Sequence, residues 1–354
     1  MNINSLNIKP ILRQFLLQRF LTERFIRFAD EEGILENLAS MRRFDMEDAV
    51  EALQRSLDYK LQDRIRLRMF KVLIDLLCEC EYTKDCGGWY MWNKEDKDSD
   101  ISMEKGEYEI VRNTFGGQAS FFEECISYAG TFLRGGPPLY SFDRNSTDIW
   151  EKFLGNAEFI FARSILTKLL IPWKDSNCTI LDLCYGPGFD ILQIQEQSPQ
   201  IQVTALDFKD IFHNQASRRI LNPDSVKWVD SALWNGFGAP LPFDGNTFDH
   251  VLFTCADPYI AGELREYVYT DIFRVLKHGG ALGILTRSYP DPGRKYVKDT
   301  WIRRGILCHD FSESVCEGWH GFHDAHESIT LFKRIGYSVH TTMLNASVWR
   351  LDKP

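Results

Sequence analysis

The stretch from Cys178 to Asp210 constrains the fold of this chain more than any other part. An apolar run of strand length, Thr179–Leu183, is followed by a helical pattern, Phe189–Gln197, and then by a second apolar run, Ile201–Leu206. Strand, helix and strand in this order predict a β-α-β unit, because the helix returns the chain so that both strands pair in parallel. The rest of the chain must then fit an α/β sheet.

The connection between the first strand and the helix is a Gly-Pro-Gly turn that contains Gly186 and Gly188. Glycine has no Cβ, so the backbone there can lie against a ligand. Asp207 ends the second strand, where an acid can accept hydrogen bonds from both hydroxyls of a ribose. Leu192 stands at about the place of the third glycine of the dinucleotide fingerprint, so no pyrophosphate cradle is expected. The pattern predicts a nucleoside site, with a plain α/β turn as the alternative.

Asp182 lies inside the first strand and begins the pattern D-x-C-x-G-x-G. This pattern resembles motif I of class I S-adenosylmethionine-dependent methyltransferases. The resemblance implies that the glycine turn receives the methionine part of S-adenosylmethionine, that Asp207 holds the ribose, and that Asp230 binds the adenine amino group. The cofactor-binding residues that it implies are Asp182, Tyr185, Gly186, Gly188, Asp207, Phe208, Asp230 and Ala232.

Strand and helix patterns alternate from Cys178 onward, as a doubly wound sheet requires. The series D-S-A, L-P-F and N-T-F-D, and R-V-L-K-H-G-G before the predicted strand Ala281–Thr286, are similar to the same family. The residues before the β-α-β unit, Trp150–Leu170, predict one long helix. The expected fold class is α/β, with a Rossmann-like class I methyltransferase sheet and a helical, winged-helix-like N-terminal dimerisation domain.

The N-terminal part reads as three helices, Glu31–Ser40, Asp45–Leu57 and Asp63–Cys80, and a hairpin around Cys86-Gly87-Gly88. This arrangement resembles the N-terminal dimerisation domain of the O-methyltransferase family, which implies a homodimer. The Gly-Gly-Pro-Pro sequence at 135–138 breaks the chain, so domains are expected at 1–135 and 136–354. A winged-helix regulator that senses a ligand is the alternative without enzymatic activity.

The charge balance bears on the partners. The chain has 41 basic and 50 acidic residues, a net charge of −9. Because nucleic-acid binding needs a basic face, nucleic acid is not an expected partner. No apolar run has the length of a membrane span, so no membrane partner is expected either.

The nine cysteines lack a C-x-x-C pair, which favours buried thiols in a reducing, cytoplasmic setting and predicts no metal site. Zinc at Cys78, Cys80 and Cys86, or a metal held by the histidines of residues 317–327, is the alternative. The amphipathic, Arg-containing start of the chain, residues 1–30, has no secretory pattern. Its apolar residues recur at helical spacing, which favours an oligomerisation or core helix, with an organelle presequence as the alternative.

The predicted acceptor chemistry depends on one departure from the family. The related O-methyltransferases have a histidine base after the fourth strand, whereas this chain has Ala256 there, followed by Asp257. A phenol has a pKa near 10 and needs a base. His320 and His323 are the candidate replacements, so the predicted catalytic residues are His320, His323 and Asp257. A thioether sulfur would need no base, because its attack on a methyl group releases no proton.

A second resemblance favours the thioether. The segment PLYSFDRNSTDIWEKFLGNAEF, together with LDLCYGPGF, is similar to the methylthiohydroxybutyrate S-methyltransferases. It implies a small hydroxy acid as substrate, whose carboxylate would need an arginine and whose product sulfonium would favour aromatic faces. The substrate-binding residues expected are Tyr140, Trp150, Arg163 and Tyr259. O-, C- or N-methylation of a small metabolite, and a member that uses the cofactor only as a cation, are the alternatives.

Overall fold

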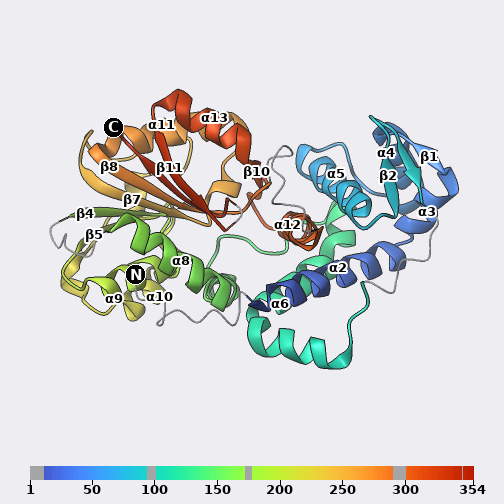
Figure 1. Cartoon of the computed structure of the whole chain (residues 1–354), viewed down its shortest axis with the longest axis horizontal. Coiled ribbons are helices and arrows are strands. Elements are labelled where there is room, and N and C mark those ends of the chain that lie inside the picture. The colour runs from blue at the N-terminus through green and yellow to red at the C-terminus, as the bar shows by residue number, and fades with distance from the viewer. Residues whose placement is uncertain (1–11, 94–100, 172–177, 290–299, 345) are drawn as a thin grey trace. The chain divides into compact units, whose positions relative to one another are not determined.

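The computed structural model describes residues 12–93, 101–171, 178–289, 300–344 and 346–354. These residues divide into two compact units (Figure 1). The sheet unit contains described residues within 142–294 and 322–354, and the helical unit contains those within 8–141 and 295–321. Residues 1–11 of the predicted amphipathic start lie outside the described residues.

The sheet unit is built on a seven-stranded sheet with the order β11-β12-β8-β7-β4-β5-β6. Five neighbouring strands, β8, β7, β4, β5 and β6, are parallel, and β12 pairs antiparallel with both β8 and β11. The strands are β4 Thr179–Leu183, β5 Gln202–Leu206, β6 Val226–Trp228, β7 Phe248–Thr254, β8 Leu276–Leu285, β11 Ser338–Met343 and β12 Val348–Asp352. The predicted Rossmann-like sheet is confirmed, and the antiparallel hairpin of β11 and β12 extends it beyond β8.

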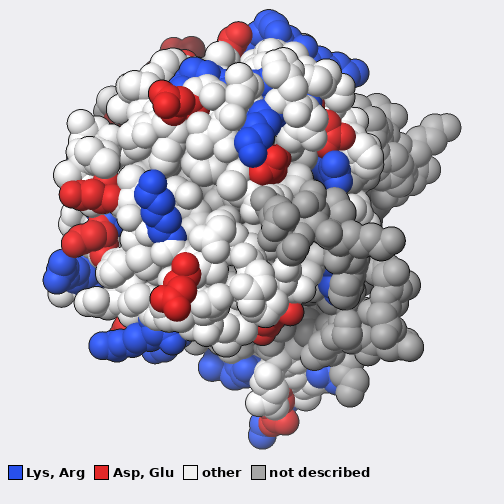
Figure 2. Space-filling model, turned by 90° about the vertical axis from the view of Figure 1, so that its left-hand side faces the viewer, with Lys and Arg blue, Asp and Glu red and all other residues white. Residues whose placement is uncertain are grey.

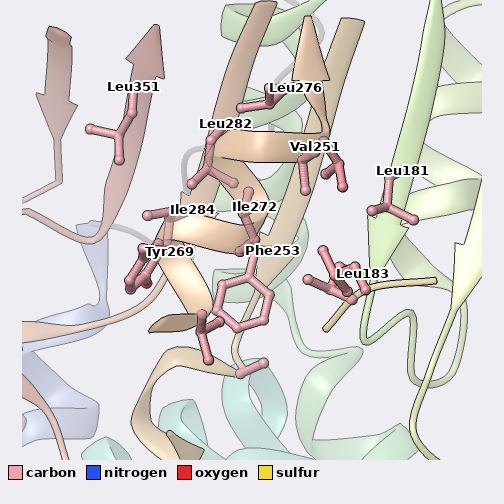
Figure 3. Close-up of a cluster of buried hydrophobic side chains, with 14 of the residues drawn as sticks. Leu181, Leu183, Val251, Phe253, Tyr269, Ile272, Leu276, Leu282, Ile284 and Leu351 are labelled. Atoms are coloured by element: carbon pink, nitrogen blue, oxygen red, sulfur yellow. The ribbon is translucent and has the colours of Figure 1, made fainter. Parts of the chain in front are cut away.

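Helices cover both faces of this sheet. In Figure 1, α8 (Ala157–Leu170), α9 (Phe189–Gln197) and α10 (His213–Arg219) lie below it, and α11 (Arg265–Val275) and α13 (Ala325–Ile335) lie above it. Figure 3 shows the core on the α11 side, where strand residues from β4, β7 and β8 gather with Tyr269 and Ile272 of α11. Burial of this apolar surface is the main stabilising contribution to the unit.

The predicted long helix Trp150–Leu170 is wrong, because two helices form here. They are α7 (Thr147–Leu154) and α8, and Gly155 and Asn156 separate them. The side chain of Asn156 accepts hydrogen bonds from the backbone N–H groups of Glu158 (2.9 Å) and Phe159 (3.4 Å). Such a cap satisfies N–H groups that have no partner at a helix start, so a new helix begins here.

The helical unit contains the predicted N-terminal elements. Asp45 caps α4 (Met46–Leu57) by accepting from Asp48 N at 2.9 Å. The predicted hairpin forms β2 and β3, and β1 pairs with β3. The described elements are α2 Gln14–Glu31, α3 Ile34–Met41, β1 Arg43–Phe44, α4 Met46–Leu57, α5 Arg64–Glu79, β2 Thr83–Asp85, β3 Tyr90–Trp92, α6 Lys105–Leu133 and α12 Thr300–Glu313.

The last of these elements, α12, comes from a late part of the sequence. It packs against α2, α5 and α6, and its Phe311 ring lies 5.1 Å from that of Phe25 and 5.6 Å from that of Phe28. The predicted domain boundary between residues 135 and 136 does not account for α12, a late segment that packs in the N-terminal, helical unit. The reason for this packing is apolar burial, since Ile306 and Phe311 are almost fully covered inside the helical unit.

Charged residues are mixed on the face of the molecule drawn in Figure 2. Among the described residues on that face, Lys and Arg alternate with Asp and Glu and form no continuous basic stripe. Among the described helices, none combines the length and the apolar character that crossing a bilayer requires. Absence of nucleic acid as a partner, a homodimer and a cytoplasmic location stay predictions.

Candidate active site

The candidate site lies at one edge of the sheet, where the parallel strands end. β4 pairs with β5 on one side and with β7 on the other. The chain order reverses at β4, because β5 and β6 extend the sheet in one direction and β7 and β8 in the other. Ligands of open α/β sheets bind outside the carboxyl ends of strands at such a switch point. The predicted site residues after β4, β5, β6 and β7 therefore belong to one edge.

The glycine turn after β4 has a backbone that needs glycine. Gly186 has φ +48° and Gly188 has φ +82°, both in the left-handed region. A Cβ on Gly188 would lie 2.8 Å from both Cα and Cβ of Ala216 in α10. Cys184, just before the turn, also has a positive φ, +61°, although it is not glycine. The turn is thus fixed by a close approach of two backbones and by local strain.

Asp207, after β5, ties the two halves of the β-α-β unit together. Its Oδ2 accepts from Gly186 N at 3.0 Å and its Oδ1 from Phe208 N at 2.8 Å. Burial raises the pKa of Asp207 to about 6, although backbone N–H donors from Gly186, Phe208 and Lys209 oppose the shift. Each carboxylate oxygen has a second lone pair, so the group can still accept hydrogen bonds from a ligand.

Asp182, inside β4, has the most unusual environment of the predicted residues. It is buried, and neither carboxylate oxygen has a hydrogen-bond partner among the described residues. Burial raises the pKa of Asp182 well above its ordinary value, and the neighbouring Asp190 raises it further. Buried polar groups are normally hydrogen-bonded, so this carboxyl group indicates a place for a ligand.

Asp190 is a site residue that the sequence interpretation missed. It is the second residue of α9, just after the glycine turn, and is buried. Thr254 Oγ1 donates to its Oδ2 at 2.6 Å, and Arg163 Nε lies 3.3 Å from its Oδ1. The sequence signal for Asp190 was weak, because an acid in the first turn of a helix usually interacts favourably with the helix dipole.

Arg163 was predicted to bind an acceptor carboxylate, but its guanidinium is buried. It lies beside Asp190 and donates to the carbonyl of Leu154 at 2.6 Å. Its side chain also lies over the rings of Phe159 and Phe189. Through these contacts, Arg163 supports the buried structure beside the site and pairs with Asp190.

Trp150 and Tyr259 lie together in an aromatic cluster of the sheet unit. The ring of Phe142 stacks on Trp150 at 5.4 Å and meets Tyr259 edge-on at 5.1 Å and Phe208 at 5.5 Å. Because Phe208 follows Asp207, this cluster lies beside the end of β5. Tyr140 belongs to the helical unit, where it stacks on Phe121 at 5.5 Å and donates to Glu124.

Asp257, after β7, is held by a buried network. Arg265 Nε donates to its Oδ1 at 3.0 Å, and the Tyr269 hydroxyl donates to the same oxygen at 2.6 Å. Burial alone would raise the pKa of Asp257, but Arg265 and then His323 outweigh burial, so the pKa is lowered. The carboxylate is therefore ionised and firmly placed.

The two candidate histidines lie in different units. His323 is half-buried in β10 (His323–Asp324), which pairs in parallel with β9 (Ser288–Tyr289) after the carboxyl end of β8. It is near enough to Asp257 to act on its carboxylate. His320 belongs to the helical unit and is half-buried there.

Residues 180–280 match the family model of a methyltransferase domain. The chain carries a class I S-adenosylmethionine-dependent methyltransferase domain. A demethylmenaquinone methyltransferase of Listeria monocytogenes is 30% identical over 138 residues, which are 38% of this chain and 55% of the relative. A mitochondrial 2-methoxy-6-polyprenyl-1,4-benzoquinol methylase of Caenorhabditis elegans is 31% identical, over 36% of this chain and 48% of that protein. The chain thus spans about half the length of these relatives.

The similarity to solved structures extends over more of this chain than the methyltransferase domain alone. The CurJ carbon methyltransferase has a TM-score of 0.66 at 13% identity and covers 99% of this chain and 95% of its own. An O-methyltransferase family 2 protein from Planctomyces limnophilus, in complex with apigenin, has a TM-score of 0.57 at 14% identity, over 99% and 97% of the two chains. At these identities the likeness establishes the fold alone.

The methyltransferase domain takes S-adenosylmethionine as its cofactor, and the residues present fit that molecule. Asp207 keeps lone pairs for ribose hydroxyls, and the glycine turn offers backbone without side chains. The orphaned carboxyl of Asp182 lies at the same strand end. The fit rests on these three observations.

The end of β6, where the sequence resemblance predicts the adenine contact of Asp230, is more exposed. Asp230 follows β6 and caps a short 3-10 helix, Ser231–Leu233, by accepting from Ala232 N at 2.9 Å. Leu233 is 62% exposed although it is apolar, which suits a residue that covers a ring. Tyr185 is buried edge-on against Trp228, with ring centres 5.1 Å apart, so it packs beneath the end of β6.

Proposed function

We propose that the protein transfers a methyl group from S-adenosylmethionine to a small-molecule acceptor. The observation that carries the proposal is the pair of acids at the switch point. Asp182 is buried without a hydrogen-bond partner among the described residues, and Asp207 is fixed by the glycine turn with accepting capacity left over. An apolar or fully paired edge would have suited a protein that only uses the fold.

S-adenosylmethionine supplies a methyl group on a positively charged sulfur, so the chain's own task is placement. Asp207 orients the ribose, and the glycine turn lets the backbone lie close to S-adenosylmethionine. The cluster of Phe142, Trp150 and Tyr259 provides apolar surface beside the same strand ends, which keeps water away from the reacting groups.

For the acceptor, we propose first an electron-rich carbon or oxygen of a phenol-like or enol-like molecule. The relatives are named for methylating a demethylmenaquinone and a benzoquinol, and a similar fold belongs to a carbon methyltransferase. Such an acceptor loses a proton during the reaction. His323 is the proposed proton acceptor, because it lies near Asp257, whose carboxylate favours a protonated imidazole. Asp257 would then be a positioning residue.

A thioether acceptor, which the sequence resemblance favoured, is here the second candidate, supported by Ala256 in the place of the family's histidine. The aromatic cluster would suit a sulfonium product. The carboxylate of a hydroxy acid would need a cation that is not already paired inside the protein. Arg163 is paired with Asp190, and Arg287 is paired with Glu158. Arg144 is the exposed alternative, paired only loosely with Asp210 at 3.5 Å.

The experiment that tests the proposal offers a labelled methyl donor with phenolic, quinol and thioether acceptors. A phenol or quinol product gains a methyl group and loses a proton, whereas a thioether product gains a methyl group and a permanent positive charge. Mass spectrometry separates the two. Transfer to neither class, although S-adenosylhomocysteine binds, would contradict both acceptor proposals and leave only the cofactor site.

Replacement of His323 tests the proposed proton acceptor. His323→Gln should lower kcat by about 10²–10⁴ with a phenolic acceptor, because the proton then has no base to receive it. The loss should shrink as the pH rises and the acceptor ionises by itself. His326→Gln, an exposed histidine three residues later, is the matched control and should keep full activity. Equal activity of the two variants would refute the role of His323.

A further inference from the structure

The side chain of Arg219 joins three elements around the glycine turn of the sheet unit. Arg219 is the last residue of α10, and its Nη1 donates to the backbone carbonyl of Pro187, in the middle of the turn. Its Nη2 donates to the carboxylate of Glu151 in α7. Its guanidinium also lies over the ring of Phe189, the first residue of α9, 3.9 Å from the ring centre. One side chain therefore contacts the turn, α7 and α9 at the same time.

These three contacts require an arginine in a partly covered place. The side chain of Arg219 is 16% exposed and that of Glu151 is 33% exposed. Water and salt screen such a pair less than they screen a pair on an open surface. A guanidinium is planar and has several donors in a fixed arrangement, so it can hold a carbonyl and a carboxylate while its face lies on a ring. The bridge is therefore specific in geometry as well as in charge.

Two further contacts tie α7 to its surroundings. Gly155, where α7 ends, approaches Phe189 so closely that a Cβ on this glycine would lie 2.5 Å from Phe189 Cζ. One helical turn away from the arginine bridge, Gln215 Nε2 of α10 donates to Asp148 Oδ1 of α7 at 3.3 Å. α7 has only eight residues, and a helix of this length depends on tertiary contacts for its stability. The order of α7 is therefore coupled to the turn and to α10.

The same short helix carries part of the proposed acceptor wall. Trp150, which precedes Glu151, is 3% exposed and stacks on Phe142 at 5.4 Å in the aromatic cluster. A displacement of α7 at Glu151 would displace Trp150 as well, because the two residues are neighbours in one helix. Methyl transfer requires the acceptor in line with the donor, and a misplacement of about 1 Å can cost about 100-fold in rate.

Resting on the proposed function, we propose that Arg219 is a positioning residue that couples the cofactor turn to the acceptor wall on α7. S-adenosylmethionine at the turn holds the Pro187 carbonyl in one place, and Arg219 transmits this order to Glu151 and so to α7. Arg219 acts through the turn and the helix rather than on the reacting groups. An acceptor that meets an already ordered wall loses less conformational entropy on binding, so the cofactor favours acceptor binding.

The test measures amide hydrogen exchange in α7 of the full chain, with and without saturating S-adenosylhomocysteine. In the wild-type protein the ligand should slow exchange in α7 by about threefold to tenfold, because opening of the helix must then also break its link to an occupied turn. Unchanged exchange in α7 of a wild-type protein that binds the ligand would overturn the inference.

Two variants separate transmission through Arg219 from direct ordering of α7 by the ligand. Glu151→Ala keeps Arg219 on the turn and Trp150 in α7, so S-adenosylhomocysteine should bind within about threefold of wild type but should no longer slow exchange in α7. Arg219→Met should lose the same protection and weaken binding by about threefold to tenfold, because the turn loses a charged donor. Protection of α7 that persists in Glu151→Ala would overturn the inference.

Arg218→Met, at the exposed neighbour of Arg219 in α10, is the matched control. It should keep both the affinity for S-adenosylhomocysteine and the protection of α7. Each comparison is made with and without ligand in the same protein, so a general loss of stability, which raises exchange in both states, does not imitate the effect.

Failure of the inference differs from failure of the proposed function. If S-adenosylhomocysteine does not bind to the wild-type protein, the methyltransferase proposal fails together with the inference. If it binds and α7 does not respond, only the inference fails. The wild-type measurement needs no variant, so an unstable Glu151→Ala or Arg219→Met protein does not remove the test.

Discussion

Gly188 carries the tightest steric constraint of the candidate site. Its φ of +82° disfavours any side chain, and a Cβ would lie 2.8 Å from the backbone of Ala216. Gly188→Ala should therefore destabilise the sheet unit by about 2–4 kcal/mol, from backbone strain and overpacking together. Gly238→Ala is the matched control, because nothing lies within 4 Å of its added Cβ. Equal melting temperatures would contradict the account of the turn.

The residues of the site were only partly predictable from the sequence. The motif located Asp182, the glycines and Asp207, because their spacing along the chain reflects one local unit. Asp190 and the burial of Arg163 were not predictable, since they depend on α8, α9 and β7 meeting at one place. The same holds for Asp257, whose partners Arg265 and Tyr269 come from α11.

At the scale of elements, the network of Asp257 links the end of β7 to α11 and α13. Arg265 donates to Asp257 and, at 3.0 Å, to Ser328 Oγ of α13. Arg265→Ala should destabilise the sheet unit by about 3–5 kcal/mol, because it leaves a buried carboxylate without its cation. Arg334→Ala, which removes an exposed ion pair with Glu266, should cost less than about 1 kcal/mol. Thermal unfolding compares the two.

The pH dependence of this network has a defined sign. Because the pKa of Asp257 is lowered in the folded protein, its contribution to stability is present above about pH 4 and is lost as the pH falls further. Arg265→Ala should remove that acid-sensitive part of the stability. Identical acid unfolding of variant and wild type would argue against the ion pair.

Elements with strong local patterns were predicted to the residue, as with Thr179–Leu183 and Phe189–Gln197. The break at Asn156 was missed, because a cap is one residue within a continuous helical pattern. The pairing of β9 with β10 and the return of α12 were also missed. They join segments far apart in the sequence, and no local periodicity encodes which partner a segment finds.

At the scale of the whole molecule, the predicted homodimer can be tested on the described surface. Removal of residues 1–30 would delete Phe20 and Phe25, which are fully buried inside the helical unit, so substitution is the better test. Leu12, two residues before α2, is 67% exposed, and Phe15, in the first turn of α2, is 49% exposed. The double substitution Leu12→Asp and Phe15→Asp should shift a dimer to monomer, because charged side chains oppose burial in an interface.

Light scattering measures that shift. Ile160→Asp, at a 46% exposed apolar residue of α8, is the control for an added surface charge and should leave the mass unchanged. A monomeric wild-type mass, or a dimer that persists in the double variant, would contradict the role of the α2 start.

The central claim is that the acid after β5 holds the ribose of S-adenosylmethionine. Its most direct test is calorimetric titration of S-adenosylhomocysteine into wild type, Asp207→Ala and Asp224→Ala. The account predicts one site per chain, an affinity at least about 100-fold weaker in Asp207→Ala because two charge-assisted hydrogen bonds are lost, and no change in Asp224→Ala. Equal dissociation constants for all three proteins, or no binding to wild type, would contradict it.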